Sequence, residues 1–168
     1  MMEVVLRDLR QPEYIHVLIN PLPVYGLSTG LVGLVVALIV RSRSAQIATL
    51  ILVLITAASA WPVYEFGEQA YDRVLTMTDD PGHAWLDEHL RRGEQLIYVF
   101  YALAVLALIA LAAPAKWPRS ARPLVIAVIV LGFVTLGAGG YIAYAGGKIR
   151  HREFRNVPPP TRKPGTER

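Results

Sequence analysis

Residues Leu96–Ala113 read LIYVFYALAVLALIALAA, a stretch of 18 residues without a charged side chain. At about 1.5 Å per residue, an α-helix of this length extends over about 27 Å, close to the roughly 30 Å hydrocarbon core of a bilayer. Inside hydrocarbon the backbone must satisfy its own hydrogen bonds, and an isolated apolar segment does so only as a helix. The stretch therefore predicts a transmembrane helix.

Three further blocks share this composition. Each is 18 to 22 residues long and lacks charged residues; they are Leu22–Val40, Ile47–Tyr64 and Leu124–Ala145. A soluble bundle would need amphipathic sequence to cover four wholly apolar helices, and a chain of 168 residues has too little of it. We therefore predict an all-α fold, an integral membrane four-helix bundle with an extramembrane helical hairpin between the second and third helices.

The composition excludes several classes of function. The chain has no cysteine, which excludes disulfide scaffolds, zinc–thiolate sites, thiol catalysis and iron–sulfur clusters. The four blocks hold no charged residue, whereas pumps and transporters normally use ionisable groups at membrane depth. Nucleotide-binding and hydrolase motifs are missing from the sequence, so we predict that the protein is not an enzyme. Its basic residues lack the interleaved aromatics of a nucleic-acid-binding surface.

The chain divides into three parts. Residues 1–15 form an N-terminal leader or a short interfacial segment, and residues 16–147 form the membrane domain. Residues 148–168 form a basic, proline-rich tail, which we expect to be disordered after Phe154. Within the membrane domain, residues 65–95 form the polar hairpin.

Prolines and acids predict where the helices begin and bend. Pro21 and Pro23 suit the first turn of a helix, so the first span is expected to begin there. Pro62 predicts a kink in the second span. Asp79 or Asp80 is expected to cap a helix that starts near His83 and continues into the third span.

Charge separates the connections between the spans. The short connections 41–46 and 114–123 carry arginine and lysine without acids, whereas the hairpin holds eight of the thirteen acidic residues. The positive-inside rule then places the short connections in the cytoplasm and the acidic hairpin outside, in a bacterial inner membrane. The basic tail lies on the same side as the hairpin and favours the opposite orientation, so both orientations stay open.

Small residues recur in the first and last spans. The first contains Gly26, Gly30 and Gly33, and the last contains Gly132, Gly137, Gly139 and Gly140. Small side chains let a second helix approach closely in lipid. We interpret these stripes as internal helix packing, with an interface between protein chains as the alternative.

Polar chemistry is thereby confined to the hairpin end of the bundle. His16 and His89 form the one pair near opposing span ends, as the axial ligands of a b-type haem would. A second candidate set offers imidazole and carboxylate ligands for a divalent metal, and it consists of Glu65, Glu68, His83, Asp87 and His89. The structural alternative is a Glu68–Arg92 or Glu65–His89 contact that pins the hairpin. The residues alone favour no bound cofactor.

Two segments resemble an uncharacterised family of four-span bacterial membrane proteins. The residues Asn-Pro-Leu-Pro-Val-Tyr-Gly at 20–26 are similar to its His-Pro…Val-His-Phe-Pro opening, and Gly-Gly-Tyr-Ile-Ala-Tyr-Ala-Gly-Gly at 139–147 to its Gly-Gly-x-Leu-Val-Tyr-x-His-Gly closing motif. The motif histidines are replaced here by Asn20, Tyr25 and Gly146, which leaves His89. The resemblance implies the fold, and it implies that a histidine-borne haem or metal site of such relatives is lost here.

Two functions follow as hypotheses. The first is a non-catalytic accessory or scaffold subunit of a larger membrane complex, whose partners are the lipid bilayer and either other proteins or a second copy of the chain. The second is a haem- or metal-binding membrane redox protein that uses His16, His89, Glu65 and Glu68 at the polar end of the bundle.

Overall fold

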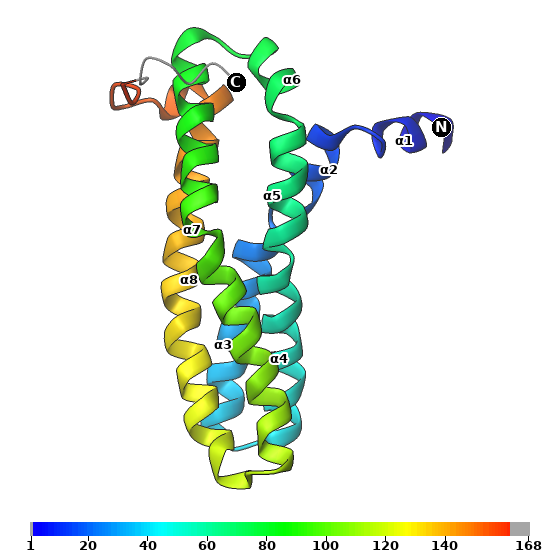
Figure 1. Ribbon diagram of the computed structural model, residues 1–168, viewed down its shortest axis with the longest axis vertical. Helices are drawn as coiled ribbons and strands as arrows, with labels where there is room; N and C mark the ends of the chain where they lie inside the picture. The colour runs from blue at the N-terminus through cyan, green and yellow to red at the C-terminus, as the bar shows by residue number, and fades with distance from the viewer. Residues whose placement is uncertain (1, 162–168) are drawn as a thin grey trace.

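The computed structural model describes residues 2–161, apart from the side chains of Met2 and Val4. Four helical segments lie side by side and each is long and apolar enough to cross a membrane (Figure 1); they are Pro12–Ile39, Arg43–Gln69, Asp80–Ala115 and Pro118–Arg150. Within the described range the chain forms helices and no strand. The predicted all-α four-helix bundle is confirmed.

The first segment begins earlier than predicted. Helices α1 (Met2–Asp8) and α2 (Pro12–Ile19) precede a π-helical turn, η1 (Leu22–Gly26), which leads into α3 (Leu27–Ile39). The expectation that the helix starts at Pro21 and Pro23 is therefore wrong. The helical path continues past Pro21, since the Tyr25 amide donates to the Pro21 carbonyl at 2.8 Å, an α-helical contact between residues four apart.

The second segment bends where Pro62 predicts it. Helix α4 (Arg43–Ala58) ends at Ser59, α5 (Ala60–Gln69) continues at a new angle, and α6 (Tyr71–Thr76) leads into the turn. Because Pro62 has no N–H, the helix cannot keep its hydrogen-bond ladder there. The bend carries α5 up to the end of the bundle.

The third and fourth segments form the tallest pair of the bundle. Helix α7 (Asp80–Ala112) starts at the predicted cap, where the Asp79 carboxylate accepts from the Gly82 amide at 3.1 Å. Short 3-10 turns, η2 (Ala113–Ala115) and η3 (Pro118–Ser120), connect it to α8 (Ala121–Arg150). Helix α8 extends five residues beyond the predicted span, so residues 148–150 belong to the bundle and not to the tail.

Glycines set the spacing between helices in the core. A Cβ at Gly30 would lie 3.0 Å from Val53 of α4, and one at Gly132 would lie 2.4 Å from Leu31 of α3. Leu31 and Val53 belong to the main buried cluster. Internal packing is thus confirmed for these positions, whereas a Cβ at Gly137 or Gly140 would meet no atom within 4 Å.

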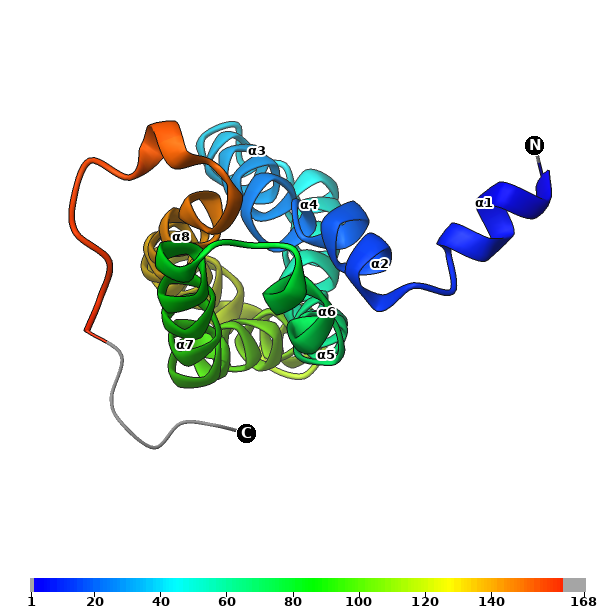
Figure 2. The same cartoon turned by 90° about the horizontal axis from the view of Figure 1, so that it is seen from above.

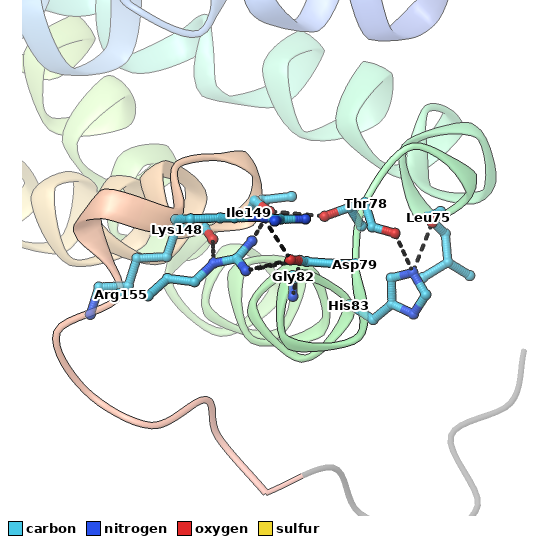
Figure 3. Close-up of polar contacts among 9 residues, drawn as sticks. Leu75, Thr78, Asp79, Gly82, His83, Lys148, Ile149 and Arg155 are labelled. Carbon is cyan, nitrogen blue, oxygen red and sulfur yellow. Dashed lines mark hydrogen bonds and ion pairs between the residues drawn. The ribbon is translucent and has the colours of Figure 1, made fainter.

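Arg155 connects the start of α7 to the end of α8 (Figure 3). After a 3-10 turn, η4 (Arg152–Phe154), its guanidinium donates to the carbonyls of Lys148 and Ile149 at 2.7 and 2.6 Å and contacts Asp79 at 2.8 Å. It therefore satisfies carbonyls at the end of α8 while it binds the residue that caps α7. The expected disorder of the tail does not extend to this anchor, and residues 162–168 lie outside the described range.

Candidate functional site

His16 projects from α2 towards α5. Its Nδ1 lies 2.8 Å from the carbonyl oxygen of Val63. The ring rests against Gly67, one turn further along α5, where a Cβ would come within 2.8 Å of the Nδ1 and Cε1 atoms. The absence of a side chain at Gly67 is what allows the imidazole to lie this close to the helix.

His89 makes the equivalent contacts from the opposite side of the bundle. It projects from α7 towards α8, and its Nδ1 lies 3.0 Å from the carbonyl oxygen of Ile142. A Cβ at Gly146 would lie 3.0 Å from its Nδ1 and Cε1 atoms. Each histidine is thus held by one backbone carbonyl and seated on one glycine of the neighbouring helix.

The two imidazoles meet at the end of the bundle. Seen from above, α2 and α5 lie on one side of this end, and α7 and α8 lie on the other (Figure 2). The ring centroids of His16 and His89 are 6.3 Å apart, with an angle of 85° between the planes. The structure therefore brings together His16 and His89, the two residues that the sequence suggested as haem ligands.

The carbonyl contacts fix the tautomer of each ring. A carbonyl oxygen only accepts hydrogen bonds, so the facing Nδ1 must carry the proton, and in a neutral imidazole Nε2 then keeps its lone pair. Within residues 2–161 neither Nε2 atom takes part in a hydrogen bond. Metal-binding histidines typically have this arrangement, in which the second nitrogen donates to a backbone carbonyl or a carboxylate.

The two rings are in edge-to-face contact, with 6.3 Å between their centroids and 85° between their planes. Neutral imidazole is a common ligand of iron, copper and zinc, so the pair is a candidate for metal binding.

Arg92 buttresses the site one turn after His89. It is buried, donates to Glu88 and to the Tyr141 carbonyl at 2.7 Å each, and stacks over the Tyr141 ring at 3.7 Å. His89 and Arg92 therefore bind consecutive carbonyls of α8, at Ile142 and Tyr141. The sequence suggested Glu68 as the partner of Arg92 and Glu65 as the partner of His89. In the structure Arg92 donates to Glu88 and to the Tyr141 carbonyl, and His89 to the Ile142 carbonyl.

Two residues of the second candidate set, His83 and Asp87, bind other groups of the hairpin. The Nε2 atom of His83 lies 2.9 Å from the Leu75 carbonyl and 3.1 Å from that of Thr78, where it binds the end of α6 (Figure 3). Asp87 accepts a hydrogen bond from Tyr71. Among the described residues no three histidine, cysteine or acidic side chains gather in a group that could hold a metal ion.

Sequence reasoning found the two histidines but not the groups that position them. Comparisons with protein-family models, with curated proteins and with solved structures found no match to this chain.

Proposed function

We propose that the protein is a multi-pass membrane metalloprotein in which His16 and His89 ligate one redox-active metal, either the iron of a b-type haem or a copper ion. The single observation that carries the proposal is the pairing of two carbonyl-anchored imidazoles 6.3 Å apart. When bound, such a centre supplies one-electron exchange.

The chain's own residues account for the site around that centre. The carbonyls of Val63 and Ile142 keep each ring in the tautomer that leaves Nε2 available, and the glycines at 67 and 146 let the rings approach. His16 lies outside both motifs of the family that the chain resembles. It offers a second imidazole where the motif histidines are replaced, so a site based on His89 does not require them.

An accessory-subunit role is the second candidate, and it is compatible with the first. Gly137 and Gly140 leave open space on α8, and Phe133 and Val134 beside them are exposed. Small residues on an apolar membrane face suit contact with another helix. We place the protein in a bacterial inner membrane with the histidine end outside, because the short basic connections favour the cytoplasm.

The test is the metal and haem content of protein purified from membranes in mild detergent. We expect about one haem per chain, seen as a Soret absorbance, or about one copper by elemental analysis without that absorbance. His16→Ala and His89→Ala should each weaken binding by about 100-fold or more, since loss of an orienting partner alone costs about 10–100-fold. His151→Ala, an exposed histidine beside Glu153, is the matched control and should bind as wild type.

Protein that is folded and monodisperse but binds neither haem nor a metal would contradict the proposal. Equal binding by the His16, His89 and His151 variants would contradict it as well. Migration of the wild-type chain as part of a larger detergent-stable assembly would support the accessory role.

A further inference from the structure

A separate cleft of about 360 Å³ lies between α5 and α7. It sits where both helices leave the predicted hydrocarbon core, since the uncharged blocks end at Tyr64 and begin at Leu96. Four aromatic rings and two carboxylates line it, from Trp61, Tyr64, Tyr98, Tyr101, Glu65 and Glu94. Its volume falls within the usual range of small-molecule sites, about 300–1,000 Å³.

Glu65 introduces a negative charge that the chain itself does not neutralise. Its carboxylate is half-buried, and within the described residues it makes no ion pair or hydrogen bond. Partial burial of an unpaired charge is unfavourable, and a cation in the cleft would relieve it. The exposed rings of Trp61 and Tyr98 flank this charge at the level of the lipid headgroups.

A second site in the protein also combines an aromatic ring with a carboxylate, and there an arginine provides the cation. Arg92 lies over the Tyr141 ring at 3.7 Å and pairs with Glu88 at 2.7 Å, so an aromatic face and a carboxylate together hold a guanidinium. The cleft between α5 and α7 offers aromatic faces and the Glu65 carboxylate, and within the described residues no cation pairs with Glu65. Aromatic rings with an acid are the chemistry that binds weakly hydrated organic cations.

We propose that this cleft binds an amphipathic organic cation, a quaternary ammonium or phosphonium group with an apolar body, which enters from the membrane interface. Two carboxylates disfavour an anion. They are also too few for a hard inorganic cation such as Ca²⁺, which takes about six to eight oxygen ligands. The proposal uses no residue of the histidine pair, so it stands or fails independently of the proposed function.

Binding of tetraphenylphosphonium to the full chain in maltoside micelles is measured by equilibrium dialysis. Micelles without protein give the background. Tetraphenylborate has the same shape and the opposite charge, so it reports partition into apolar surface. We expect saturable binding of about one phosphonium per chain and no saturable binding of borate.

Matched variants locate the site. Glu65→Gln should weaken phosphonium binding about tenfold or more, whereas Glu68→Gln, the same change at an exposed position of α5 outside the cleft, should leave it unchanged. Tyr98→Ala removes an exposed ring and should weaken binding several-fold without a change in thermal unfolding. Absence of saturable binding, equal binding of both ions, or full affinity in Glu65→Gln would overturn the proposal.

Discussion

His16 and His89 face each other across the end of the bundle with 6.3 Å between their ring centroids, and each donates its Nδ1 proton to a carbonyl of a neighbouring helix. One ring belongs to the first helical segment and the other to the third. Both rings are held from behind by backbone, which does not adjust as a side chain would. The backbone contacts therefore fix the position and tautomer of both rings.

The glycines behind the rings should control metal affinity. In Gly146→Ala the new Cβ would lie 3.0 Å from His89, and in Gly67→Ala it would lie 2.8 Å from His16, so each ring must shift away from its carbonyl. We expect metal affinity to fall about 10–100-fold, measured by competition with a chelator. Gly140→Ala meets no atom within 4 Å and is the matched control. Equal affinity in all three variants would show that the glycines do not position the imidazoles.

The glycines of α3 should control helix packing instead. A side chain at Gly30 would meet both the Val53 side chain, at 3.0 Å, and its backbone nitrogen, at 3.4 Å, so α3 and α4 must move apart. We expect Gly30→Leu to lower the free energy of unfolding by about 1–3 kcal/mol, measured by thermal or denaturant unfolding in detergent. Gly137→Leu places the same side chain in open space and should cost much less. A larger loss at Gly137 would contradict this account.

The tail anchor should respond to acid. Desolvation opposes ionisation of Asp79, but hydrogen bonds from Arg155 and Gly82 and the charges of Arg155 and Arg152 outweigh it, so its pKa lies below the usual value. A carboxyl with a depressed pKa stabilises the folded state above its unfolded pKa of about 3.9, and that contribution is lost as the pH falls through the folded value. We therefore expect the anchor to persist from neutral pH to about pH 4.

A spin label at Val157, introduced as Val157→Cys in this cysteine-free chain, measures the release. The label should be immobilised at pH 7 and pH 5 and become mobile below about pH 4. Arg155→Gln should mobilise it at every pH, and Arg150→Gln, at an exposed position, should not. Release between pH 6 and pH 7 would rule out Asp79 as the responsible group.

The orientation of the protein in the membrane can also be tested with single introduced cysteines. Met77→Cys lies at the histidine end and Ser44→Cys near the opposite end, and both positions are exposed. If the basic connections are cytoplasmic, a membrane-impermeant maleimide on intact cells should label the cysteine at 77 and not the one at 44. The reverse pattern would place the histidine pair on the cytoplasmic side.

The parts of the fold that depend on local sequence were predictable. Hydropathy predicted the four spans, Pro62 predicted the bend, and Asp79 predicted the start of α7. Each of these features depends on residues that are close together in the sequence. The start of the first segment was not. Pro21 and Pro23 were expected to begin a helix, and the π turn instead continues it from α2, which brings His16 into the bundle.

The histidine pair was only half predictable. Its members stood out as imidazoles near opposing span ends, but their separation depends on how α2 and α5 pack against α7 and α8. Gly67 and Gly146 carry no signal of their own, since a glycine that seats an imidazole looks in the sequence like any other small residue in a helix. His83 shows the converse, because its spacing from Asp87 suggested a metal while its ring binds backbone carbonyls.

X-ray absorption at the edge of the metal bound to purified protein tests the central claim most directly. The account predicts scattering from two imidazole rings with metal–nitrogen distances of about 2.0–2.1 Å, reduced to one ring in His16→Ala or His89→Ala whenever metal is retained. A metal whose ligands include no imidazole, or a ligand shell that both variants leave unchanged, would contradict it.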